Sequence, residues 1–224
     1  EWDGFAARRK EAAARGRLAG IGVANYLESP TGMPAERTDL TILPEGRVTA
    51  VIGTQASGQG HETAFAQVVA SQLGIPLDQV AVLFGDSDLA VIGGGSHSDR
   101  SMRIAGTILV RASDEIIAKG RVIAAQLLEA AEADIRYEAG RFIVTGTDRS
   151  VGLFELGPLA ATSEISQRLF AHPTGAAACE VEIDPELGAV RLTRYATVDD
   201  AGRIINPMIV EGQVHGGIAQ SVGQ

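Results

Sequence analysis

The sequence predicts an α+β protein with mixed sheets built from repeats of a β-hairpin plus a helix, with the helices packed on one face. Short runs of alternating apolar residues flank turn residues, which is typical of hairpins. Longer runs place apolar residues three and four positions apart, as on one face of a helix. The expected order is hairpin, helix, strand, helix, hairpin, hairpin, helix, and a strand–helix–strand crossover adds a parallel pair to the antiparallel ones.

The first elements follow from composition and turn residues. Residues 5–17 are rich in Ala, Lys and Arg and predict an exposed helix. Residues 21–27 predict a strand. The turn cluster Pro44-Glu45-Gly46 separates two apolar runs, so we expect a hairpin over 39–43 and 47–52.

A polar loop over residues 53–60 precedes a helix predicted over 61–73, which has its apolar residues on one face. Gly74 ends this helix, and Pro76 blocks its continuation. The next strand is expected over residues 79–84. The remaining predicted elements are a loop over 85–101, a helix over 102–133 weakened or bent at Gly120, hairpins over 135–144 and 178–198, and a last helix over 208–224.

Composition and charge restrict the class of protein. Gly accounts for 27 of 224 residues, above the roughly 7% that is usual. Aromatic residues are only 4%, so the core is expected to consist of Ala, Val, Ile and Leu. The formal net charge is −9 without a dense basic patch, which argues against nucleic-acid binding. No run approaches about 18 apolar residues, so no membrane span is expected.

The single cysteine, Cys179, cannot form an internal disulfide and favours a reducing compartment, so a cytoplasmic location is expected. It lies on a predicted strand, where apolar residues alternate with Glu180 and Glu182. We therefore expect the face with the glutamates to contact solvent.

Both ends resemble cuts in a longer chain. Glu1 is not an initiator Met, and the last helical pattern has no C-terminal stop. We expect residues 1–224 to be one partial domain of a longer polypeptide, with possible sub-repeats over 18–135 and 136–224.

The first stretch with ligand-binding character is residues 54–63, between a strand and a helix. Gly58 and Gly60 permit close approach of the backbone, and Gln59 offers both donors and an acceptor. The helix start adds free N–H groups, which suit anionic oxygens. The stretch is either a cradle for a phosphate or an oxygen-rich cofactor, or an ordinary turn with a hydroxyl cap. It matches neither a Walker loop nor a dinucleotide fingerprint.

The second stretch, residues 93–101, is a glycine-rich loop that also opens a helix. Its hydroxyls, its arginine and the helix N-terminus suit an anion, and the alternative is a mobile loop with a serine cap. The groups that suit an anion are Ser96, Ser98, Arg100 and Ser101, whereas a lone histidine such as His97 is more often a hydrogen-bonded surface residue than a ligand. No His or Cys spacing indicates a protein-ligated metal, so no metal ligand is predicted.

A third stretch, residues 198–217, places Gln213 beside glycines at the start of a helix. As in the first stretch, a glutamine lies next to glycines that permit close approach of a ligand. Asp199 and Asp200 are adjacent, so on a strand they point to opposite faces and do not form a catalytic pair.

Several motifs recur in a family-specific order. They are Gln-x-x-Gly-Gln-Gly-His-x-Thr at 55–63, Gly-Asp-Ser-Asp at 85–88, Gly-Gly-Gly-Ser at 93–96, Arg-Ser at 100–101, Glu-Val-Glu-Ile-Asp-Pro at 180–185, Val-Asp-Asp-x-Gly-Arg-x-Ile-Asn-Pro at 198–207 and Gly-Gln-Val-His-Gly at 212–216. Over about residues 5–224 the chain resembles the molybdenum-binding large subunit of the xanthine dehydrogenase, aldehyde oxidase and carbon monoxide dehydrogenase family.

The resemblance implies that Gly58, Gln59 and Gly60 contact a molybdopterin cofactor, expected in its cytosine dinucleotide form. It implies that residues 96–101 hold the pterin and its phosphates, and that Gln213 is a second cofactor-contacting glutamine. The implied reaction hydroxylates an aldehyde or an N-heterocycle, or oxidises carbon monoxide, with oxygen from water. The cofactor performs the oxidation, and electrons leave through iron–sulfur clusters to FAD in partner domains or subunits.

Two departures limit what these residues are expected to do alone. Asp99 stands where relatives usually carry Gly or Ser, and its charge disfavours a nearby phosphate unless Arg100 or a water intervenes. The family's catalytic glutamate lies beyond the Gly-Gln-Val-His-Gly motif, and its substrate loop lies upstream, so no catalytic residue is predicted here. The segment between Gly157 and Gly175 is also expected to be shorter than in relatives.

We therefore expect an isolated fragment that is inactive, with at most weak cofactor affinity, and that needs the remainder of its large subunit. One alternative is a phosphate- or nucleotide-binding domain that uses the glycine loops. The other is a non-catalytic assembly module with exposed apolar helix faces.

Overall fold

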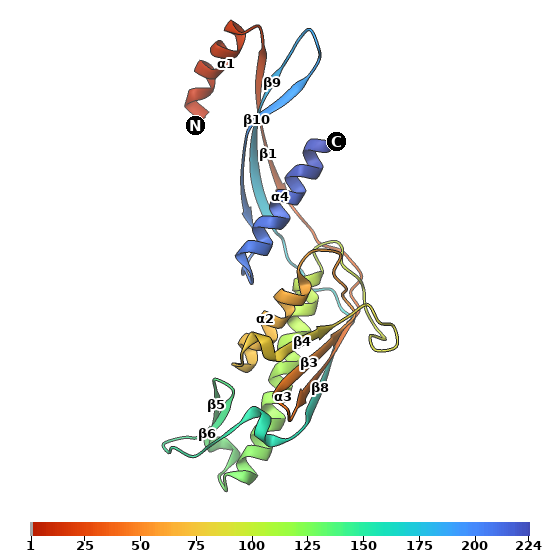
Figure 1. Cartoon of the computed structure of the whole chain (residues 1–224), viewed down its shortest axis with the longest axis vertical. Coiled ribbons are helices and arrows are strands. Elements are labelled where there is room, and N and C mark those ends of the chain that lie inside the picture. The colour runs from red at the N-terminus through yellow and green to blue at the C-terminus, as the bar shows by residue number, and fades with distance from the viewer. Residues whose placement is uncertain (1) are drawn as a thin grey trace. The chain divides into compact units, whose positions relative to one another are not determined.

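The computed structural model describes residues 2–224, which form two compact units. Unit 1 combines the residues up to Ser29 with Phe170–Arg203, and unit 2 combines Pro30–Leu169 with Ile204–Gln224. Both antiparallel and parallel strand pairs occur beside helices, so the α+β class with mixed sheets is confirmed (Figure 1). Short turns of 3-10 helix occur at Trp2–Gly4, Leu77–Gln79, Glu132–Asp134 and Leu153–Leu156.

Unit 2 is built on a four-stranded sheet with the strand order β4-β3-β2-β8. Its strands are β2 (Glu36–Leu43), β3 (Arg47–Ile52), β4 (Val80–Leu83) and β8 (Leu159–Ile165). The β2–β3 and β2–β8 pairs are antiparallel, whereas β3 and β4 are parallel. The predicted hairpin is confirmed, although β2 begins at Glu36 instead of residue 39.

One face of this sheet forms the core of unit 2. Alternate residues of β2 are buried, and the helices α2 (His61–Leu73) and α3 (Gly106–Leu127) contact the sheet and each other. Toward the turn of the hairpin this face is apolar, with Leu40 and Ile42 fully buried. Toward the start of β2 the same face becomes polar, because it carries the buried side chains of Glu36 and Thr38.

The helix predicted over residues 61–73 is confirmed, whereas the prediction for the longer helix was partly wrong. A π-helical turn, Ser101–Ala105, precedes α3, which ends at Leu127 instead of residue 133. Gly120 lies inside α3 and is buried there. A Cβ atom at this position would lie 2.4 Å from Cζ of Phe142. Gly120 therefore permits close packing of the helix against Phe142.

A small sheet of β5 (Ile135–Glu138), β6 (Arg141–Val144) and β7 (Ser150–Gly152) packs at the end of α2, which confirms the hairpin predicted there. Tyr137 donates its hydroxyl to the carbonyl oxygen of Leu73 at 2.6 Å. This bond satisfies a carbonyl at the helix C-terminus. Burial raises the pKa of Tyr137 to about 12.

Replacing Tyr137 with Phe is expected to lower the free energy of unfolding by about 1 kcal/mol near neutral pH, through loss of this hydrogen bond. The folded-state pKa lies above the ordinary value of 10, so the contribution of Tyr137 is present below about pH 10 and is lost as the pH rises toward 12. Urea unfolding near pH 8 and near pH 11 measures the difference between wild type and variant. The matched control is Tyr195→Phe in unit 1, which leaves the hydrogen bond between Tyr137 and Leu73 in place.

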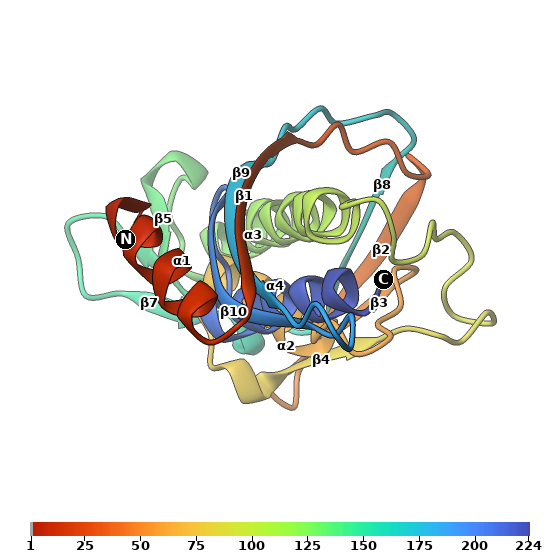
Figure 2. The ribbon, with the colours of Figure 1, turned by 90° about the horizontal axis from the view of Figure 1, so that it is seen from above.

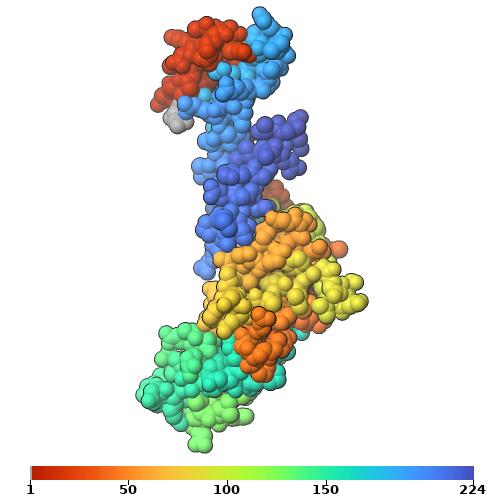
Figure 3. Space-filling view, viewed as in Figure 1, coloured from red at the N-terminus to blue at the C-terminus, as the bar shows by residue number. Residues whose placement is uncertain are grey.

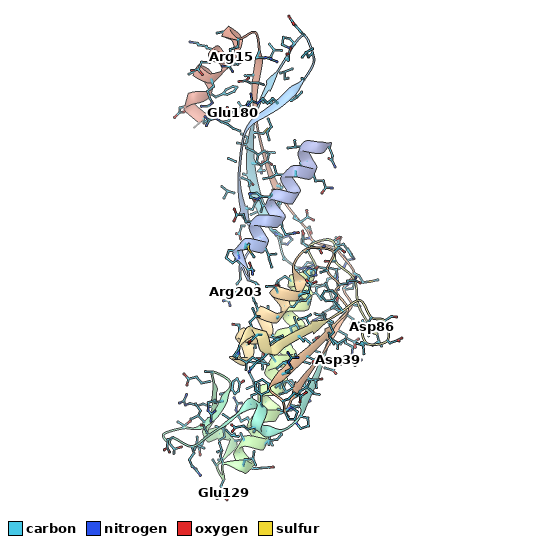
Figure 4. The ribbon with its side chains drawn as sticks, viewed as in Figure 1. Arg15, Asp39, Asp86, Glu129, Glu180 and Arg203 are labelled. Carbon is cyan, nitrogen blue, oxygen red and sulfur yellow. The ribbon has the colours of Figure 1, made fainter. Side chains whose placement is uncertain are left out.

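Unit 1 contains an antiparallel sheet of β1 (Leu18–Leu27), β9 (Thr174–Ile183) and β10 (Val190–Asp200) in the order β1-β9-β10. Helix α1 (Phe5–Ala14) lies beside β1 in Figure 2. Arg8 of α1 pairs with Glu180 of β9, which is only 8% exposed. Figure 4 labels Arg15 and Glu180 on these facing elements, and Arg15 pairs with Glu182 at 2.6 Å. The prediction of a solvated glutamate face was wrong at Glu180, because α1 covers it.

The expected repeat of a hairpin plus a helix is not confirmed. β1 pairs with β9, and β8 pairs with β2, so strands pair across the boundary between the sub-repeats 18–135 and 136–224. The last helix, α4 (Pro207–Gly223), agrees with prediction. None of the helices within residues 2–224 combines the length and apolar character that crossing a lipid bilayer requires.

Candidate functional site

Two loops emerge at one edge of the four-stranded sheet. Residues 53–60 follow β3, and residues 84–100 follow β4. Because β3 and β4 are parallel neighbours, their carboxyl ends lie at the same edge. Each loop leads into a helix N-terminus, the first into α2 and the second into the π-helical turn before α3. The second loop, shown in yellow, reaches the surface in Figure 3.

Side chains join the second loop to the start of α2. The hydroxyl oxygens of Ser96 and Ser101 lie 2.8 Å apart, and Nε2 of His61 lies 3.4 Å from Oγ of Ser96. The ring of His61 stacks on Phe65 with a centroid distance of 4.8 Å. Burial lowers the pKa of His61 below its usual value, so the imidazole is neutral at neutral pH. The arrangement is a neutral cluster of hydroxyl and imidazole groups.

The first loop leaves backbone donors available. Gly60 is the N-cap of α2 with a φ of 71°, and no side-chain cap hydrogen bond occurs at this helix start within residues 2–224. The first N–H groups of α2 therefore lack a side-chain partner, which argues against an ordinary capped turn. A Cβ atom at Gly58 would meet nothing within 4 Å, so the space beside it is open. The carboxamide oxygen of Gln59 accepts a hydrogen bond from the amide of Ser57.

The tip of the second loop is held by its own hydrogen bonds. Nε2 of His97 lies 2.9 Å from the carbonyl oxygen of Gly94, so this nitrogen carries the proton. Nδ1 lies 3.1 Å from Oγ of Ser98. Ser98 and Asp99 both have positive φ, of 49° and 52°. Asp99 is exposed at this tip.

The side chain of Arg100 points into the protein interior and makes its contacts there, whereas the composition of the loop had suggested an anion as its partner. It is fully buried and pairs with Glu36 at 2.8 Å. Its remaining N–H groups donate to Thr54 and to the carbonyl oxygens of residues 33, 35 and 95. Arg100 therefore holds the loop in place, and it does not neutralise Asp99.

Gln213 lies on α4, whose start contacts the first loop. Asn206 caps α4 through the amide of Ile209 and donates to Gln67 of α2 at 2.9 Å. A Cβ atom at Gly60 would lie 2.8 Å from Cδ1 of Ile209. Residues four apart share a face of a helix, so the exposed Gln213 lies on the same face of α4 as Ile209. The structure thus brings this face toward Gly60.

Two polar residues at this edge have roles that sequence reasoning missed, Glu36 and Thr54, both fully buried. The sequence did contain a signal for Glu36. Alternate residues of a strand share one face, so Glu36 lies on the same face as Thr38, Leu40 and Ile42, which are core positions. Arg103 was also overlooked. It follows Ser101 in the π-helical turn, and its Nε and one Nη are buried without a hydrogen-bond partner within residues 2–224.

Comparison with known proteins assigns the family. The sequence profile of the molybdopterin cofactor-binding domain matches residues 1–224. The chain belongs to this family. The cofactor-binding domain is 34% identical over 241 residues to the carbon monoxide dehydrogenase large chain of Afipia carboxidovorans, covering 95% of this chain and 30% of the relative.

A second relative, the 6-hydroxypseudooxynicotine dehydrogenase complex subunit gamma of Paenarthrobacter nicotinovorans, is 32% identical over 96% of this chain and 29% of its own length. The structure of quinoline 2-oxidoreductase from Pseudomonas putida 86 matches with a TM-score of 0.89 and 33% identity, over 99% of this chain and 32% of that chain. The cofactor-binding domain thus spans about 30% of the length of its curated relatives. The resemblance to molybdenum hydroxylase large subunits is confirmed.

The donors at this edge fit a pterin that carries phosphates. Uncapped amides at the start of α2, the hydroxyls of Ser96 and Ser101 and the open space beside Gly58 all suit polar oxygen atoms. The charge balance differs from that of many phosphate sites, because the only Lys or Arg within residues 53–63 and 85–101 is the buried Arg100. Within these two segments the available donors are neutral hydroxyl and amide groups.

Proposed function

We propose that residues 1–224 hold part of the molybdopterin cofactor of a molybdenum hydroxylase large subunit. The observation that carries this proposal is the convergence of the two loops at the carboxyl edge of β3 and β4, where both lead into helix N-termini. The family match over the whole chain supports it. The alternative of a nucleotide-binding domain lacks a comparable observation.

In this proposal some residues donate hydrogen bonds to the cofactor, and others leave room for it to come close to the backbone. The open space beside Gly58 lets the cofactor approach the loop backbone. In the proposal, amide groups of Gln59 and Gly60 donate to it. The second loop surrounds the pterin and its phosphates. It contributes the hydroxyls of Ser96, Ser98 and Ser101, the tip residues His97 and Asp99, and the backbone of Arg100. Gln213 reaches the cofactor from α4.

The cofactor, in its cytosine dinucleotide form, supplies the oxidation chemistry when it is bound. The chain's own groups bind and orient it. By analogy with the relatives, the substrate is carbon monoxide, an aldehyde or an N-heterocycle. In this proposal, iron–sulfur clusters and FAD in partner domains or subunits accept the electrons. Relatives named as a large chain and as a complex subunit support the existence of partner subunits. The single cysteine supports a cytoplasmic location.

The test uses the longer polypeptide that contains residues 1–224, produced with molybdate, and measures molybdenum and pterin per folded chain. The proposal expects both to be present, and expects Gln59→Ala to lower them several-fold by removing a carboxamide donor. The control is Gln126→Ala, which removes an exposed glutamine side chain in α3, outside both loops and α4. Unchanged cofactor content in Gln59→Ala would contradict the role of Gln59. Stoichiometric molybdenum with turnover in residues 1–224 alone would contradict the expected inactivity of this part.

Asp99 gives a second prediction at this site. Asp99→Asn removes a charge beside the proposed phosphates, and Asn tolerates positive φ as Asp does. We expect cofactor affinity to rise by about 3- to 10-fold at low salt, since an exposed charge pair is worth ~1 kcal/mol at close range. The gain should shrink as salt screens the charges. Asp148→Asn, an equal change at an exposed position outside both loops, should leave affinity unchanged at every salt concentration.

A role in assembly is a second candidate, because α4 is apolar and yet exposed. Within residues 2–224 this helix has no buried residue, and Met208 and Val222 are 75% and 56% exposed. Such a surface is typical of an interface. Gel filtration of residues 1–224 alone would show self-association if α4 is such an interface, and a monomer at high concentration would argue against it.

A further inference from the structure

A buried polar cluster joins the start of β2 to the two proposed cofactor loops. Glu36, the first residue of β2, is fully buried, and its Oε2 accepts a hydrogen bond from Arg100 at 2.8 Å. The hydroxyl of Thr54 donates to the same oxygen. Thr54 belongs to the loop after β3, and Arg100 to the loop after β4. One carboxylate therefore binds both loops at once.

Arg100 is the centre of this cluster. A guanidinium has five N–H donors, and each has an acceptor here. Nε donates to the carbonyl oxygen of Met33 at 2.8 Å. One Nη donates to Thr54 and the carbonyl of Gly95, and the other to the carbonyl of Ala35 and to Glu36. No donor of Arg100 is left for a ligand.

The backbone is packed tightly around this cluster. A Cβ atom at Gly94 would lie 2.5 Å from Cζ of Arg100, and the amide of Gly94 lies 3.4 Å from Oε2 of Glu36. A Cβ atom at Gly53 would lie 2.7 Å from Oε1 of Glu36. Glycines in both loops therefore pack directly against the Arg100–Glu36 ion pair. The position of each loop depends on this ion pair.

We infer that Glu36 is a positioning residue, which acts through Arg100 and Thr54 to fix the two loops relative to each other before any cofactor binds. This inference rests on the proposed function, because a fixed arrangement of the two loops matters only if they bind the cofactor together. An ordered pair of loops loses less conformational entropy when it binds a ligand. A buried ion pair with all donors satisfied selects one arrangement, since any displacement leaves a buried charge unpaired.

The test compares Glu36→Gln with wild type in the longer polypeptide, first without cofactor, from a host that cannot make molybdopterin. Amide hydrogen exchange in residues 53–60 and 93–101 is expected to speed up by about tenfold or more, whereas β3 and α3 stay protected. In a host that makes the cofactor, pterin content per folded chain should fall to roughly half or less. The matched control is Glu180→Gln, the same change at another buried, Arg-paired carboxylate, in unit 1.

A second pair of variants keeps the test decisive if Glu36→Gln does not fold. Thr54→Val keeps the shape but removes the hydroxyl that joins Glu36 to Arg100, and Thr54→Ser restores that hydroxyl. Faster loop exchange and lower pterin content in Thr54→Val, with rescue in Thr54→Ser, would support positioning. Lower thermal stability with wild-type loop exchange and pterin content would overturn it. If the wild-type protein contained no pterin, only the proposed function would be contradicted. The role of Glu36 would still be decided by amide hydrogen exchange in the two loops.

Discussion

Replacing Arg100 with Met is expected to lower the free energy of unfolding by about 3–5 kcal/mol, the usual cost of removing one partner from a buried ion pair. Both side chains of the Arg100–Glu36 pair are 0% exposed. Removal of the guanidinium leaves the carboxylate buried and uncompensated, and it leaves three backbone carbonyls without their donor. Urea unfolding followed by circular dichroism measures the change.

The matched control is Arg37→Met, which breaks the pair between Arg37 and Asp39 on the outer face of the same sheet. Those side chains are 33% and 34% exposed, so the loss should be within about 1 kcal/mol. The double variant Glu36→Leu/Arg100→Met should recover part of the stability lost by Arg100→Met, because no buried charge is left. If Arg100→Met and Arg37→Met lowered the free energy of unfolding equally, the larger effect expected for the buried ion pair would be contradicted.

Local sequence patterns predicted the elements that are determined locally. The hairpin of β2 and β3 follows from a turn cluster between two alternating runs, and α2 follows from an apolar face that ends at Gly74. The positions of β1 and β8 could not be predicted in this way. Each pairs with a strand more than a hundred residues away, and no local pattern identifies such a partner.

The same limit applied to the candidate site. The glycines and hydroxyls of both loops were predictable as candidate cofactor contacts, because close backbone approach and free helix N-termini depend on neighbouring residues. The direction of the Arg100 side chain was not, because it depends on Glu36, which is distant in sequence. Glu36 itself was missed since the strand was expected to begin at residue 39. A charged residue in phase with core positions is the pattern that would have indicated a buried partner.

The glycines of the two loops also divide according to their surroundings, which sequence alone did not show. A Cβ atom at Gly53 would lie 2.3 Å from Cα of Gly93, and one at Gly93 would lie 2.5 Å from Cα of Gly53. These two glycines serve backbone packing between the loops. Gly58, in contrast, faces open space, and only a glycine of this kind is free to let a ligand approach.

Gly53→Ala is therefore expected to lower the free energy of unfolding by about 3 kcal/mol, at the upper end for overpacking, because the obstructing atoms belong to the backbone and cannot rotate away. Relief of the contact requires the two loops to separate, so pterin content should fall with stability. Gly217→Ala on α4 is the control, since a Cβ atom there meets nothing within 4 Å. It should raise helix stability by roughly 0.5–1 kcal/mol, as Ala replaces Gly within a helix. A Gly53→Ala variant with wild-type stability would show that the loops can move apart freely, and would remove the basis for their fixed arrangement.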